Sequence, residues 1–235
     1  MCFSASASLG SFLLLSGCCL FIYLRNYPLS QPFSLIFFTV GLMQLSEFFM
    51  WRDLNCGWMN HYATKLAFII LLIQPIVVVF SIYYYGLSKL SSIFMKYSFI
   101  FYVSLYGFLI IWTLLFGEKK LCSLPNRKSG HLIWDIKSID LPNFVKHVLF
   151  PFFYFLSSLF FLTFKKFSVG LSYFLLLFFT LLLSMRIYAH KNTSTSWKSL
   201  WCFLVNFIPI LFIIYSEINK SLQKRKKANK NQKIN

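Results

Sequence analysis

The chain has 235 residues, of which 58% are hydrophobic, 21% aromatic and only 12% charged, and its formal net charge is +17. A soluble domain typically has about 45–50% apolar and about 25% charged residues, so this composition excludes a soluble globular protein and a disordered chain. The apolar residues gather in runs of roughly 20, the length of helix that crosses a hydrocarbon layer of about 30 Å.

Seven apolar runs predict transmembrane helices, because no alternation of apolar and polar residues indicates barrel strands. The predicted helices are residues 3–24, 32–51, 63–85, 97–117, 148–164, 168–185 and 199–216. We therefore expect an all-α fold, a polytopic transmembrane helix bundle of about seven helices that forms a single unit over residues 1–218. Residues 219–235 are expected to be a basic, disordered tail.

The first predicted helix sets the orientation of the chain. Residues 1–24 carry no charged side chain, and Arg25 follows them directly. Because Lys and Arg at a helix end stay in the cytoplasm, we expect the N-terminus outside and, after seven helices, the C-terminal tail in the cytoplasm.

The seven Lys and Arg residues of the tail would contact anionic lipid or serve only as a topology anchor. The bilayer is the predicted partner, and no nucleic-acid partner is predicted.

Glu47 in the second predicted helix is the first candidate functional residue. A charged group inside hydrocarbon costs about 2.5–3.5 kcal/mol, so an acidic residue within a membrane helix indicates a functional or structural role. Gln44 and Trp51 share a helix face with Glu47, at spacings of three and four residues. This face either lines a polar site inside the bundle, or Glu47 pairs with Arg186 and ties the second helix to the sixth.

Other polar residues within the predicted helices have two interpretations as well. They are Gln74 before Pro75, the pair Tyr102 and Tyr106, and the set Cys202, Asn206 and Pro209. They either line a polar cavity or make hydrogen bonds between helices and repair a proline kink.

The predicted topology brings further chemically active side chains to the outer face. His131, His190 and Glu47 are residue types that bind zinc, although no diagnostic spacing accompanies them. Apart from this candidate zinc ion, no cofactor is predicted. Cys2, once Met1 is removed, would combine an amine with a thiol and could act as a nucleophile. Cys56 and Cys122 fall in outer loops, where one disulfide could form. The full candidate polar site comprises Cys2, Gln44, Glu47, Trp51, His131, Arg186, His190 and Cys202.

Four short segments carry a resemblance to a protein family. They are the opening Met1-Cys2-Phe3-Ser4-Ala5, the pattern Gln44-x-x-Glu47-x-x-x-Trp51, His131-Leu132, and Ser199-Leu200-Trp201-Cys202-Phe203. They resemble an uncharacterised family of small multi-pass membrane proteins that open Met-Cys-Phe/Trp-Ser-Ala. The resemblance implies no activity. It does imply that four residues belong to one site, namely Cys2, Glu47, His131 and Cys202.

Three functional hypotheses follow. The favoured one is a non-enzymatic protein that binds, senses or moves a small solute or lipid through a site around Glu47. The second is a metal-dependent intramembrane hydrolase with the layout of alkaline ceramidases, in which His131 and His190 bind the metal and Glu47 acts as a ligand or as the base. The third is a non-catalytic membrane scaffold whose polar residues only hold helices together.

Overall fold

The computed structural model describes residues 4–25, 29–116, 120–126, 130–134, 141–189 and 204–232. It is an all-α bundle, which confirms the predicted fold class. The helices are α1 (Ala5–Arg25), α2 (Ser30–Arg52), α3 (Trp58–Tyr84), α4 (Ser92–Phe116), α5 (Phe150–Leu159), α6 (Phe167–Ala189) and α8 (Ile208–Gln232). A π-helical turn, η1 (Val145–Leu149), precedes α5, and a 3-10 turn, η2 (Phe160–Thr163), follows it.

The length and hydropathy of the helices make this an integral membrane protein. Within the part of the chain that the structure describes, five helices are long and apolar enough to cross a membrane: α1, α2, α3, α4 and α6. Shorter apolar helices cover residues 150–163 and 208–218. Each of the seven predicted runs therefore overlaps a helix, although the last helix begins at Ile208 rather than at residue 199.

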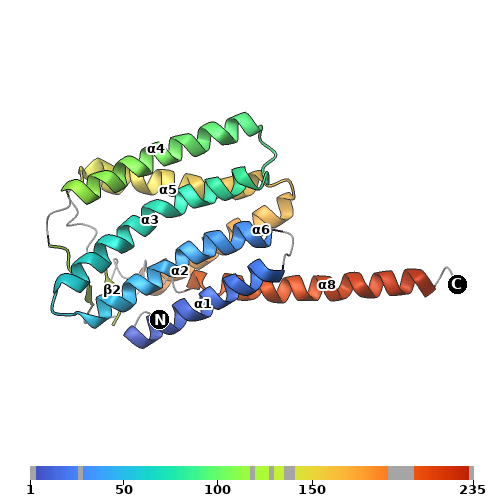
Figure 1. Ribbon diagram of the computed structural model, residues 1–235, viewed down its shortest axis with the longest axis horizontal. Coiled ribbons are helices and arrows are strands. Elements are labelled where there is room, and N and C mark those ends of the chain that lie inside the picture. Colours follow the sequence, from blue (N-terminus) through green and yellow to red (C-terminus); the bar gives the residue numbers. More distant parts are fainter. Residues whose placement is uncertain are drawn as a thin grey trace.

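Four helices lie in a row in chain order, α1 beside α2, α2 beside α3 and α3 beside α4 (Figure 1). Helix α5 packs against α3, α6 packs against η2, and α8 packs against α1 and α2. Successive helices run in opposite directions, so the connections alternate between two ends of the bundle. We call one the disulfide end, formed by residues 53–57, 120–126 and 130–134. The other is the aromatic end, formed by residues 85–91 and 164–166 with the rings around Phe33.

The C-terminal segment differs from the sequence prediction. Helix α8 continues to Gln232, through residues that we expected to be a disordered tail. Lys, Arg, Gln and Ala are strong helix formers, and neither Gly nor Pro interrupts the chain after Pro209, so an established helix can propagate through the basic segment. The helix extends beyond the other helices at the aromatic end (Figure 1).

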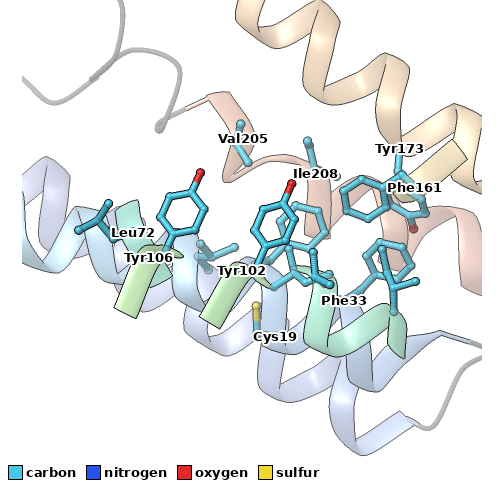
Figure 2. Packing of buried hydrophobic residues seen from close by; sticks show 14 of the residues in the cluster. Cys19, Phe33, Leu72, Tyr102, Tyr106, Phe161, Tyr173, Val205 and Ile208 are labelled. Atoms are coloured by element: carbon cyan, nitrogen blue, oxygen red, sulfur yellow. The ribbon is translucent and has the colours of Figure 1, made fainter. Parts of the chain in front are cut away.

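Aromatic rings fill the core at the aromatic end. Phe33 of α2 stacks on Tyr173 of α6 with ring centroids 3.9 Å apart, and it also packs against Phe161, Phe164 and Phe212. Figure 2 shows Phe33, Phe161 and Tyr173 gathered in one group. Because aromatic pairs gain more than their area burial alone, these rings join four segments that are far apart in sequence.

Backbone hydrogen bonds connect the two chain reversals at this end. Lys89 N–H donates to the Thr163 carbonyl at 2.7 Å, and Lys165 N–H donates to the Leu87 carbonyl at 2.8 Å. Gly86, at φ +57°, supplies the left-handed conformation that turns the chain after α3. Gly170 lets α6 approach η2 closely, because a Cβ atom there would collide with the Phe161 carbonyl oxygen.

Two buried tyrosines join α4 to α5. Tyr102 and Tyr106 donate their hydroxyl protons to the carbonyls of Phe153 and Phe150, at 3.1 and 3.3 Å. Their rings are stacked with centroids 5.8 Å apart, and their hydroxyls point the same way (Figure 2). Of the two interpretations of this pair, the structure supports hydrogen bonding between helices.

Candidate functional site

A short hairpin is inserted between helices at the disulfide end. Its strands, β1 (Leu124–Pro125) and β2 (Leu132–Ile133), pair in antiparallel fashion. Leu132 and Trp134 are buried in an apolar cluster with residues of α2 and α3, namely Met43, Met50, Ala63, Ala67, Ile70 and Leu71. The second strand of the hairpin is therefore part of the core, whereas Leu124 of the first strand is exposed.

A disulfide attaches this hairpin to the connection between α2 and α3. Cys56 and Cys122 are bonded, with their Cα atoms 5.3 Å apart and 66 positions apart in the sequence. The bridge that the sequence allowed is thus confirmed. Because a disulfide restricts the unfolded chain, this covalent link stabilises the position of the hairpin.

A buried polar network surrounds the disulfide, and Asn60 is its centre. The Asn60 amide nitrogen lies 2.9–3.2 Å from the carbonyl oxygens of Met50, Asp53 and Ser123. Its amide oxygen accepts the Ser123 backbone N–H at 2.8 Å. The Asp53 carboxylate accepts the N–H groups of Gly57 and Asn60 at the start of α3, where a helix has N–H groups without intrahelical partners. The network fixes the hairpin to α2 and α3 through directional bonds.

Glu47, the main candidate from the sequence, is completely buried and holds the hairpin. The indole Nε1–H of Trp134 donates to Glu47 Oε1 at 3.0 Å. Gln44, one turn earlier on α2, is also completely buried. The hydrogen-bond donor of this carboxylate is thus a tryptophan that lies 87 positions away in the sequence.

The other predicted site residues are placed as follows. His131 is buried in the hairpin, and its carbonyl accepts the Asn126 N–H at 2.8 Å. Trp51 is partly buried against the apolar cluster of α2 and α3. Arg186 on α6 is exposed while Glu47 is fully buried, so the structure gives no support to an ion pair between them.

The zinc hypothesis gains no support from the described residues. Among residues 4–25, 29–116, 120–126, 130–134, 141–189 and 204–232, no three His, Cys, Asp or Glu side chains come together as a metal site. Cys2, His190 and Cys202 lie outside the described residues, so the site that the resemblance implies stays a prediction.

Trp134 also forms part of the wall of an intramembrane cavity. The cavity has a volume of about 380 Å³ and lies between α2, α3, α5 and α6, and Trp134, Phe161 and Val205 also line it. None of the described residues that line it carries a charge, and most are aromatic or aliphatic. The residue that donates a hydrogen bond to the Glu47 carboxylate, Trp134, therefore also lines this apolar cavity.

The polar groups in the cavity wall are few. Ser157 and Thr39 donate their hydroxyl protons to carbonyls of their own helices, Tyr154 and Ile36, at 2.6 and 2.7 Å. Gln74 of α3 accepts a hydrogen bond from the Tyr154 hydroxyl of α5. The amide nitrogen of Gln74 has no hydrogen-bond partner among the described residues, although the side chain is 94% buried.

No protein-family model, no curated protein and no solved structure matches this chain. The resemblance to the family that opens Met-Cys-Phe/Trp-Ser-Ala therefore stays a prediction, and the function has to be argued from the geometry.

Sequence reasoning did not identify Trp134 as a functional residue. It lies in a polar stretch between two predicted helices, where a single tryptophan has no periodic pattern around it. The buried Glu47 was the available signal, because a carboxylate in a membrane helix needs a donor from elsewhere in the chain.

Proposed function

We propose that this membrane protein binds a small apolar molecule of the lipid phase in the cavity between α2, α3, α5 and α6. The observation that carries the proposal is the cavity itself. Its volume of about 380 Å³ lies within the range of roughly 300–1,000 Å³ that is typical of ligand pockets. Its described lining is apolar, aromatic and uncharged, which suits hydrocarbon and disfavours an ion or a charged solute.

In this proposal Glu47 acts through Trp134 and not by direct contact with the ligand. The carboxylate accepts the indole N–H, and Trp134 forms part of the cavity wall. Glu47 is thus a positioning residue that holds this wall in place. The favoured sequence hypothesis, a binding site around Glu47, is narrowed to a lipid-phase ligand beside Trp134.

Photolabelling in nanodiscs tests the proposal. A dodecane that carries a diazirine group is expected to label peptides of α2, α3, α5 and α6, and the labelling should saturate. Val78→Phe and, separately, Val40→Phe place a larger side chain in the cavity wall and should reduce this labelling severalfold. Val103→Phe is the matched control, because Val103 is 40% exposed on α4 and does not line this cavity. Labelling that rises linearly with probe, or that is equal in all four proteins, would contradict the proposal.

We also propose that the N-terminus lies outside and the C-terminal tail in the cytoplasm. The disulfide supports this orientation, because disulfides persist in oxidising compartments, and the Cys56–Cys122 end is also the end at which α1 begins. In sealed cells, a membrane-impermeant reductant should open the disulfide, while a C-terminal epitope should stay protected from external protease. Protease cleavage of the epitope in sealed cells would reverse the assignment.

A further inference from the structure

Among the described polar side chains of the cavity wall, Gln74 has a buried donor that no hydrogen bond to another described residue satisfies. Gln74 lies roughly 5 Å along the helix from the midpoint of α3, at a rise of 1.5 Å per residue. Its oxygen accepts the Tyr154 hydroxyl, so the amide is fixed in the wall of the cavity. Its nitrogen has no hydrogen-bond partner among the described residues. A buried donor of this kind is costly unless an acceptor meets it.

An acceptor of the backbone lies one turn away on the same helix. Pro75 is inside α3 and has no N–H, so it cannot supply the hydrogen bond that the Leu71 carbonyl would receive in a regular helix. Leu71, Gln74 and Pro75 all line the cavity. This wall therefore combines an amide donor with a carbonyl that lacks its usual helical partner.

A hydroxyl group is complementary to that combination, because one hydroxyl both accepts and donates a hydrogen bond. A phosphate or an ammonium group is not, because no described lining residue carries a charge that would compensate it. We propose that the occupant of the cavity is a neutral lipid whose single polar group is a hydroxyl, bound by Gln74 near the middle of the membrane. This inference rests on the proposed function and specifies its ligand class.

The test titrates three competitors of equal chain length against the diazirine-labelled dodecane, each over the same range of mole fractions in the bilayer. They are 1-dodecanol, dodecane and dodecyl phosphate. One hydrogen bond gained in a buried site corresponds to roughly a tenfold gain in affinity. We expect 1-dodecanol to compete at roughly tenfold lower mole fraction than dodecane, and dodecyl phosphate to compete no better than dodecane.

Variants of Gln74 attribute the preference to the amide. Gln74→Leu should bring 1-dodecanol and dodecane within about twofold of each other while cavity labelling persists. Gln74→Met, which preserves the chain length, is a second variant should the first fail to fold. Thr113→Val is the matched control and should keep the tenfold preference, because Thr113 is buried in α4, does not line the cavity and donates its hydroxyl proton to the Leu109 carbonyl.

The outcomes separate this inference from the proposed function. Saturable labelling without a preference for 1-dodecanol, or a preference that survives in both Gln74 variants, overturns the hydroxyl-lipid inference and leaves the cavity proposal standing. Better competition by dodecyl phosphate than by 1-dodecanol also overturns it. Absence of saturable labelling in the unmodified protein overturns both proposals.

Discussion

The two ends of the bundle are held together by different kinds of interaction. At the disulfide end, a covalent bridge, the hydrogen bonds of Asn60 and the contact between Trp134 and Glu47 fix a hairpin between α2 and α3. At the aromatic end, stacked rings around Phe33 and the close approach at Gly170 pack α2, α6 and η2 together. Hydrogen bonds and the disulfide have fixed directions, so they specify the position of the hairpin. The packing of the rings around Phe33 depends instead on how well the side chains fill the space between the helices. The cavity lies between these two regions, and its lining takes Trp134 from one and Phe161 and Tyr173 from the other.

The largest expected effect comes from opening the disulfide. Replacing both Cys56 and Cys122 with Ser should lower the free energy of unfolding by about 2–5 kcal/mol, because the unfolded chain regains the freedom that the bridge removed. Thermal unfolding in detergent measures this as a lower Tm, and a reductant added to the unmodified protein should reproduce it. Cys18→Ala, which changes a free cysteine, is the control and should leave the response to reductant intact. Equal Tm values for the oxidised and reduced protein would show that the disulfide does not stabilise the fold.

Asn60→Ala is expected to cost about 3 kcal/mol at the same end. The substitution leaves the Ser123 N–H and several buried carbonyls without their side-chain partner, and each such group costs about 1–3 kcal/mol. Chemical denaturation followed by tryptophan fluorescence gives the value. Asn143→Ala, at an exposed position, should change stability by less than about 0.5 kcal/mol. Similar values for the two variants would mean that the network does not specify the hairpin.

At the aromatic end, Gly170→Ala should destabilise the fold by about 1–3 kcal/mol, because the new methyl group collides with the Phe161 carbonyl. The matched control is Gly107→Ala in α4, where an added Cβ meets no atom within 4 Å. That change should stabilise the helix by about 0.5–1 kcal/mol. Opposite shifts of Tm for the two variants are the expected result. A Tm for Gly170→Ala at or above that of the unmodified protein would show that α6 and η2 are not tightly packed.

The smallest effect is expected for the basic segment beyond the aromatic end. We propose that the first basic residues of α8 contact anionic lipid, at about 1 kcal/mol for each Lys or Arg near the surface. Because α8 extends away from the bundle as far as Gln232, its residues 230–232 lie roughly 15 Å or more along the helix from Lys220, beyond a Debye length of about 8 Å. Lys220→Gln with Lys224→Gln should therefore weaken phosphatidylserine binding, measured by titration in nanodiscs, more than Lys230→Gln with Lys233→Gln. Equal weakening by both pairs would instead indicate a tail that lies along the membrane.

The sequence predicted the bundle well and the site only in part. Apolar runs of about 20 residues permit few structures other than membrane helices, so the positions of α1 to α6 followed from residue type alone. Glu47 was recognisable for a related reason, because its burial has an energetic cost that its surroundings have to offset. Its donor Trp134 was not recognisable, since the contact depends on how a distant hairpin folds between α2 and α3.

The cavity and the C-terminal helix show the same difference between what residue type predicts and what depends on the packing of distant segments. Gln74 and Pro75 indicated either a polar cavity or a repaired kink, and only the packing of α5 and α6 against α3 places Gln74 in a cavity wall. Helix α8 extends through residues 219–232 because their local propensity favours a helix, whereas the high charge of the same segment is typical of a disordered tail.

The central claim is that the cavity beside Trp134 binds a lipid-phase molecule, and native mass spectrometry of protein extracted gently from its own membrane tests it most directly. We predict a bound neutral species on the unmodified protein and on Val103→Phe, and its loss from Val78→Phe and Val40→Phe. A bound species of the same mass and occupancy on all four proteins, or none on any of them, would contradict the claim.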